Sequence, residues 1–143
     1  MFYCSQQYWP VVLFEFQAEQ SQQDHQVFLD IWDELFQRQE PFIVLRVYHD
    51  ETALIHSPSV GKLTRQWLKD GADEKIKQHV KAMIHIVPEA AYPKMQHMSV
   101  EKVFGVPGGI FSATEDAIAW FNQQPLDLGI TLNIDYFARG KTD

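Results

Sequence analysis

The sequence predicts an α/β protein in which helices pack on a mixed, mostly parallel central sheet. Strand-like segments rich in β-branched residues alternate with helix-like segments between residues 11 and 121, an order typical of parallel strands joined by helices. Two strand-like segments precede the first helix, which indicates an antiparallel hairpin. The chain of 143 residues is 45% hydrophobic, and it is long enough to bury a core as one domain.

Five strands are expected in this sheet. The first two surround a bend at residues 7–10, which contains Pro10, and the later strands are bounded by proline or glycine. The segment of residues 11–17 is apolar enough to be buried on both faces. The strands are predicted at residues 2–6, 11–17, 42–47, 82–87 and 110–111.

About four helices complete the predicted layers. The first follows Ser21 and carries one apolar stripe, formed by Val27, Phe28, Ile31, Trp32, Leu35 and Phe36. The second begins at Ser57, a good cap, and runs to about residue 80, although Gly71 interrupts its pattern. A weaker helix is expected at residues 94–103. The last begins at a capping box formed by residues 112–115 and ends before residue 125.

The C-terminal segment has the most regular pattern of the chain. Between residues 126 and 137 apolar side chains occupy the even positions, namely Leu126, Leu128, Ile130, Leu132, Ile134 and Tyr136. A period of two predicts a strand with one buried face, and the backbone of such a strand needs a partner. We therefore predict a domain at residues 1–125 and a C-terminal strand extension and tail at residues 126–143. The strand would extend the sheet within its subunit or form a homodimer across a two-fold axis.

Charge and composition exclude several classes of function. The net charge is −7, with two basic and nine acidic residues before Ser59 and ten of each from there on. Nucleic-acid binding needs a concentrated positive field and is not expected. No apolar run approaches the roughly 20 residues of a membrane helix, so we expect a cytoplasmic protein without a transmembrane segment. Cys4, the single cysteine, excludes an internal disulfide and a cysteine zinc cage.

Four local patterns accompany the order of the elements. They are Gln39-Glu-Pro-Phe-Ile-Val-Leu at the entry to the third strand, Trp67-Leu68 in the long helix, Ala82-Met-Ile-His-Ile-Val-Pro88, and Phe111-Ser-Ala-Thr-Glu-Asp-Ala-Ile-Ala-Trp-Phe121. Between residues 11 and 121 the chain thereby resembles the anti-sigma-factor-antagonist (STAS) fold, in its divergent SpoIIAA-like branch. The resemblance implies a STAS-like sandwich. It also implies a non-enzymatic regulatory module that binds a protein partner and needs no cofactor.

The phosphorylation switch of that family lies in an Asp-Ser-Ser-Gly-like loop. Here the corresponding stretch reads His56-Ser57-Pro58-Ser59-Val60-Gly61, so Pro58 stands near the expected phosphoacceptor and the motif is absent. Ser57 and Ser59 flank it, which leaves phosphorylation open. A helix cap explains Ser57 adequately.

The loop after the third strand and the helix that follows hold the predicted partner-binding residues. Ligands of α/β sheets usually bind outside the carboxyl ends of the strands. The candidates are His49, Asp50, Glu51, His56, Ser57 and Ser59, with Lys62 and Arg65 beside them. A solvated helix face explains the two basic residues as well as a binding patch does.

Two alternatives accompany the interaction module. Binding of a small apolar, lipid-like ligand would use aromatic side chains, although their core-facing positions favour a role in filling the core: Trp32, Phe36, Trp67, Trp120 and Phe121.

A metal-assisted hydrolase would use His49, Asp50 and His56. Their spacing matches no established metal motif. His85 lies in an apolar strand, where a proton carrier is a less common interpretation than a buried histidine bonded to a carbonyl.

Overall fold

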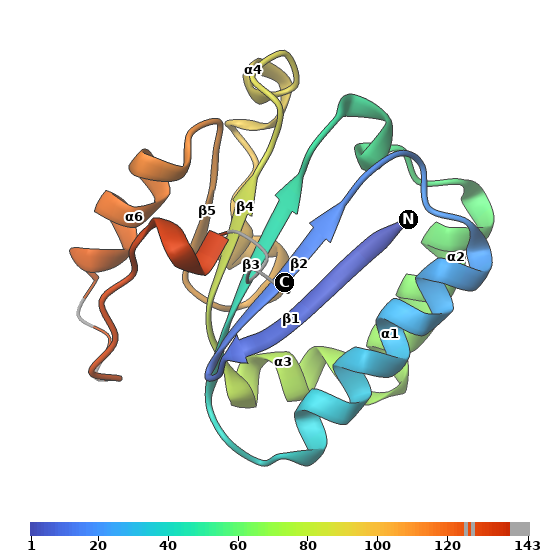
Figure 1. Cartoon of the computed structure of the whole chain (residues 1–143). Helices are drawn as coiled ribbons and strands as arrows, with labels where there is room; N and C mark the ends of the chain where they lie inside the picture. Colours follow the sequence, from blue (N-terminus) through green and yellow to red (C-terminus); the bar gives the residue numbers. More distant parts are fainter. Residues whose placement is uncertain (125, 127, 138–143) are drawn as a thin grey trace.

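A five-stranded mixed sheet forms the centre of the protein (Figure 1). The computed structural model describes residues 1–124, 126 and 128–137. The strands follow one another across the sheet in sequence order: β1 (Phe2–Tyr8), β2 (Val11–Phe16), β3 (Phe42–Tyr48), β4 (Val80–Ile86) and β5 (Gly108–Phe111). β1 pairs with β2 in antiparallel orientation, and β2 to β5 are parallel. The predicted fold class, an α/β protein with a mixed, mostly parallel sheet, is confirmed.

The helices are more divided than the sequence predicted. They are α1 (Gln22–Gln37), α2 (Pro58–Trp67), α3 (Asp73–His79), α4 (Tyr92–Met95), α5 (Val100–Phe104) and α6 (Thr114–Asn122). Shorter turns are η1 (Glu51–Leu54), the π-helical η2 (Leu68–Ala72) and η3 (Ile134–Phe137). In the part of the chain that the structure describes, no helix has the length and hydropathy needed to cross a membrane.

Two local causes explain this division. Gly71 adopts φ +131°, which is outside the helical region, and η2 therefore separates α2 from α3. The predicted helix at residues 94–103 is two helices, because Ser99 is extended and its side chain accepts a hydrogen bond from the backbone of Lys102. A serine in this conformation begins a new helix instead of continuing the previous one.

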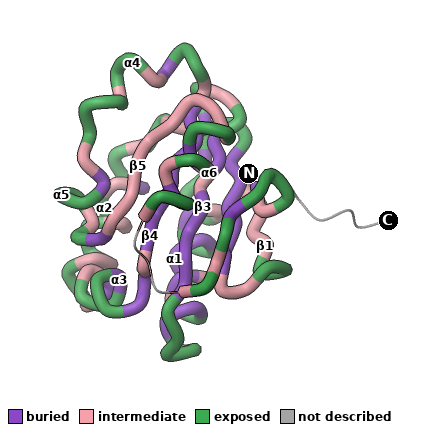
Figure 2. The backbone as a smooth tube through the Cα atoms, turned by 90° about the vertical axis from the view of Figure 1, so that its left-hand side faces the viewer, coloured by how far each residue is buried: buried purple, intermediate pink, exposed green. Residues whose placement is uncertain are grey.

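Each face of the sheet packs against its own set of elements (Figures 1 and 2). The first face carries a core with Phe14, Trp32 and Ile76, built from the strands and from α1, α3 and α5. The opposite face packs against α6 and the C-terminal segment through Phe121 and Leu132. The central strands are therefore buried on both sides, as their nearly continuous apolar sequences predicted.

The prediction of a C-terminal strand is wrong. Residues 128–133 form no strand, and η3 follows them. Gly129 has φ +66°, which interrupts an extended chain. The side-chain amide of Asn122 on α6 forms hydrogen bonds with both backbone groups of Leu132. Its Nδ2 donates to the Leu132 carbonyl oxygen at 3.2 Å, and the Leu132 N–H donates to its Oδ1 at 2.9 Å. A helix side chain thus replaces the sheet partner that the pattern required.

The alternating apolar pattern of this segment nonetheless identifies most of the side chains that face the core. Leu132 is 2% exposed, and Leu128, Ile130 and Tyr136 pack partly buried against the core of the second face. Ile134 is the exception, at 55% exposed. Residues 128–133 therefore offer no strand for the predicted homodimer. The predicted boundary at residue 125 and the tail at residues 138–143 lie outside the described residues.

Two predictions at helix starts also need correction. The buried stripe of α1 begins at His25, two residues before the predicted start at Val27, which is 47% exposed; the His25 ring bonds to Thr64 of α2. The capping box before α6 does not form. Ala113 occupies the cap position, and no side chain caps this helix.

Candidate functional site

A cavity of about 390 Å³ lies between the first face of the sheet and its helices. Its floor comes from three neighbouring strands: Arg46 and Tyr48 of β3, Met83 and His85 of β4, and Ile110 of β5. Successive side chains of a strand alternate between faces. Every second residue of β3 and β4 therefore reaches this side of the sheet.

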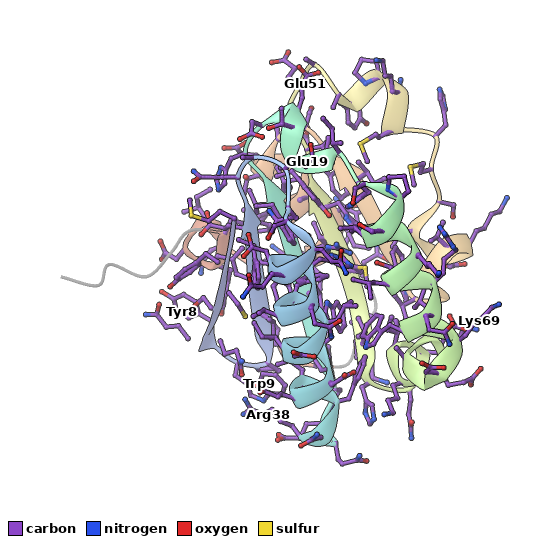
Figure 3. The ribbon with its side chains drawn as sticks, turned by 90° about the vertical axis from the view of Figure 1, so that its right-hand side faces the viewer. Tyr8, Trp9, Glu19, Arg38, Glu51 and Lys69 are labelled. Carbon is purple, nitrogen blue, oxygen red and sulfur yellow. The ribbon has the colours of Figure 1, made fainter. Side chains whose placement is uncertain are left out.

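The walls of the cavity are mostly apolar side chains from the helices. They include Phe28, Leu29 and Trp32 of α1, Trp67 of α2, and Val100 and Phe104 of α5. Figure 3 views the helical side, where α1 and α2 lie in front of the sheet.

The most exposed side chains of the cavity lining come from α5, from the residue before Ser99 and from the loop before α2. Met98 and Val103 are 52% and 56% exposed, and both line the cavity together with Leu54 and His56 from the loop side. These four side chains mark the part of the lining that is at least partly exposed to solvent.

Arg46 provides the permanent charge of the cavity. A guanidinium stays protonated in proteins, and this one lies over three aromatic rings, with Cζ 5.1 Å from the centroid of Phe28, 5.6 Å from Phe16 and 5.8 Å from Tyr48. Its Nε atom is buried and has no hydrogen-bond partner in the part of the chain that the structure describes. No aspartate or glutamate lines the cavity, and no described carboxylate forms an ion pair with Arg46.

His85 lies directly beside Arg46 in the neighbouring strand, since the two residues are in register between β3 and β4. Its ring is stacked between Tyr48 and Phe104, at centroid distances of 6.4 and 6.1 Å. Burial and the charge of Arg46 lower the pKa of His85 to about 3. Its Nε2 atom is buried without a partner among the described residues. The expectation of a histidine satisfied by a neighbouring carbonyl is therefore wrong for this nitrogen.

His25 is held by α2. Its Nε2 lies 2.6 Å from Oγ1 of Thr64, and that hydroxyl donates its own proton to the Val60 carbonyl at 3.1 Å. The histidine must then donate to the threonine, which assigns the proton to Nε2. Burial lowers the pKa of His25 to about 4, and the neighbouring charges of His56 and Arg46 contribute in the same direction.

His56 completes the set of titratable groups in the cavity. Burial and Arg46 both lower its pKa. Near neutral pH all three histidines are consequently uncharged. The cavity then combines apolar walls with a single positive charge and several neutral donors.

The other predicted loop residues have structural roles away from the cavity. The Nε2 atom of His49 lies 2.8 Å from Oε1 of the buried Glu15. The carboxylate of Asp50 accepts hydrogen bonds from the Thr52 hydroxyl at 2.6 Å and from the Ala18 backbone at 3.0 Å. These bonds, that of Thr52 first, lower the pKa of Asp50 and fix the turn after β3.

The proposed metal ligands are not brought together. His49 and Asp50 make the contacts just described, whereas His56 lines the cavity. Within residues 1–124, 126 and 128–137 no group of three His, Cys, Asp or Glu side chains could hold a metal ion.

The remaining predicted residues lie on the surface around the start of α2. Ser57 caps this helix by accepting a hydrogen bond from the Val60 backbone at 3.3 Å, so the cap interpretation is confirmed. Its hydroxyl also lies 3.1 Å from that of Ser59. Glu51, labelled in Figure 3, is exposed, as are Lys62 and Arg65.

Sequence reasoning found only part of this site. It named His56 as a partner-binding residue, and it named Trp32 and Trp67 as residues for an apolar ligand. All three line the cavity. Phe121 instead belongs to the core of the opposite face. Arg46 was missed, although a charged residue inside an apolar strand is an unusual feature that the sequence itself displays.

Comparisons with known proteins add no assignment: no protein-family model matches the chain, and neither the curated proteins nor the solved structures contain a significant match.

Proposed function

We propose that the protein is a non-enzymatic binding module for a small, largely apolar ligand that occupies the cavity above β3 and β4. The observation that carries this proposal is a hollow of about 390 Å³ with apolar walls in an otherwise packed core. Protein interiors contain few voids larger than a water molecule. The volume falls within the range of roughly 300–1,000 Å³ that is typical of small-molecule sites.

The side chains of the cavity suit an apolar ligand. Trp32 and Trp67 offer flat surfaces, and three methionines, Met83, Met95 and Met98, also line it. Methionine side chains are unbranched and polarisable, so they adapt to ligands of different shape. This lining favours an aliphatic or aryl-alkyl ligand over a sugar or a nucleotide, which would need more polar partners.

Tryptophan fluorescence tests this proposal. In a variant with Trp9→Phe and Trp120→Phe, the two remaining tryptophans both line the cavity. We expect 11-bromoundecanoate to quench their emission saturably, because bromine quenches a ring in close contact.

The matched control replaces the two cavity tryptophans, Trp32 and Trp67, with phenylalanine. Emission then comes from Trp9, which is covered by Arg38 at 3.6 Å, and from Trp120 near Phe111. Neither lines the cavity, so no saturable quenching is expected. Equal quenching in both variants, or none in either, would contradict the proposal.

A protein-interaction module of the STAS type is a second candidate. Its support is the element order, a hairpin followed by parallel strands joined by helices, together with the position of the loop before α2. Leu54 and His56 of this loop border the cavity, and the exposed Glu51 and Ser59 lie on the same stretch. A bound ligand could thereby alter the surface offered to a partner.

This second candidate makes a separate prediction. Replacing Glu51 and Ser59 with alanine should abolish capture of a partner from native lysate and leave ligand binding unchanged. If the variant captures the same proteins as the wild type, these loop residues do not form the partner surface.

A further inference from the structure

We propose that Arg46 and His85 form a subsite for a carboxylate, so that the ligand of the cavity is a small fatty or aryl-alkyl acid. This inference rests on the proposed function, because it assigns the polar end of the same ligand. Its basis is the pairing of two buried, unsatisfied nitrogen atoms at one place on the cavity floor.

Arg46 and His85 lie side by side because their strands pair in the sheet. Arg46 and His85 are register partners in parallel strands, and both belong to the floor of the cavity. His85 is 8% exposed. Its Nε2 and the Nε of Arg46 are buried, and neither has a hydrogen-bond partner within residues 1–124, 126 and 128–137. Buried polar groups are normally satisfied, so two adjacent exceptions on side chains that line a hollow point to a ligand as the source of the missing partner.

The surroundings leave the charge of Arg46 uncompensated. The rings of Phe16, Phe28 and Tyr48 lie around the guanidinium, and cation–π contacts of this kind stabilise a cation without satisfying its N–H groups. Among the described residues, no Asp or Glu carboxylate belongs to the lining. Arg46 is half-buried, and a charge withdrawn from water is ordinarily paired with an opposite charge; here the cavity is the place from which such a charge can come.

A carboxylate fits this subsite better than a phosphate. One permanent cation balances one negative charge, whereas a phosphate monoester carries about −1.5 to −2. The planar fork of the arginine also matches two carboxylate oxygens. The remaining lining residues are mainly apolar, which suits the hydrocarbon part of such an acid.

Binding of a matched series to the wild-type protein tests the inference. Undecanoate, 1-undecanol and undecylamine share a chain and differ in the polar end. Isothermal titration calorimetry should give the tightest binding for the acid, about tenfold or more over the alcohol, and the weakest for the amine. This series requires no mutation and is independent of the folding of any variant.

Variants then locate the effect. Arg46→Gln should weaken undecanoate binding about ten- to hundredfold and leave 1-undecanol binding nearly unchanged. The matched control is Arg38→Gln, because Arg38 is exposed at the other end of the molecule, over Trp9 (Figure 3). It should leave both affinities unchanged.

The outcomes separate the two proposals. Equal affinity of the acid and the alcohol for the wild type would overturn the carboxylate subsite and leave the apolar binding function standing, and so would undecanoate binding that is unchanged by Arg46→Gln. If neither compound binds, the proposed function fails together with the subsite.

Discussion

Acidification should destabilise this protein at an unusually high pH, because two histidines are buried in uncharged form. His25 and His85 are 6% and 8% exposed, with pKa values of about 4 and about 3. In the unfolded chain a histidine titrates near about 6.5. Between these values the unfolded chain binds protons that the folded chain does not. Above about pH 6.5 both histidines are neutral in the folded and the unfolded chain, and the free energy of unfolding is at its full value. It falls as the pH falls toward 4.

The magnitude follows from the linkage between proton binding and folding. Each histidine lowers the free energy of unfolding by about 1.4 kcal/mol per pH unit within this window. Two histidines over about 1.5 units give roughly 4 kcal/mol at about pH 5. A typical domain is stable by about 5–15 kcal/mol, so the loss is a large share of the total. His56 acts in the same direction, since its pKa is also lowered.

Urea unfolding followed by tryptophan fluorescence at about pH 7.5, 6 and 5 measures this effect. His85→Gln should lower the stability at neutral pH, because it removes the ring stacked on Tyr48 and Phe104, and should remove about half of the pH slope. The control His97→Gln changes an exposed ring and should keep the slope. A wild type whose stability is flat between pH 7.5 and 5, or a His85→Gln variant with the full slope, would refute the reasoning.

Two further predictions concern the packing of the fold. Leu132→Ala should lower the free energy of unfolding by about 2–5 kcal/mol, whereas Ile134→Ala, at an exposed site, should change it by less than about 0.5 kcal/mol; equal effects in urea unfolding would contradict the described C-terminal segment. Gly108→Ala should unfold the protein or greatly lower its melting temperature by circular dichroism, because the added Cβ would collide with the backbone oxygen of Met83. The matched Gly61→Ala meets only the end of a flexible side chain and should keep a melting temperature close to the wild type, and a stable Gly108→Ala variant would argue against the close approach of β4 and β5.

The strands and their order of occurrence could be predicted because their signal is local. Residues 42–48 are apolar almost throughout, and a strand buried on both faces needs such a sequence. Helix starts were predictable where a side chain caps them, as at Ser21 and Ser57. The start of α6 was not, because its cap position holds Ala113 and no capping bond forms.

The C-terminal segment shows what an alternating pattern can and cannot predict. It specified the buried side of Leu132 correctly, because alternation reports only which side chains face the core. It could not specify the hydrogen-bond partner. That partner is the side chain of Asn122, ten residues earlier in the sequence and without any pattern of its own.

The site was less predictable than the fold, for a physical reason. A cavity depends on the distance between packed elements, and this distance is not encoded in the periodicity of any one of them. The polar loop at residues 49–59 has the composition of a binding site, yet its side chains mostly cap helices and fix turns. Arg46 carries the stronger signal, because a charge in a buried strand must be explained by a partner or by a ligand.

The most direct test of ligand binding uses the four methionines of the chain. Met83, Met95 and Met98 line the cavity, and Met1 is 62% exposed and lies outside it. In a protein labelled with ¹³C at the methionine methyl groups, titration with undecanoate should shift three methyl resonances along one common saturation curve and leave that of Met1 in place. Three cavity resonances that do not move, or a shift of all four without saturation, would contradict the assignment of this cavity as a ligand site.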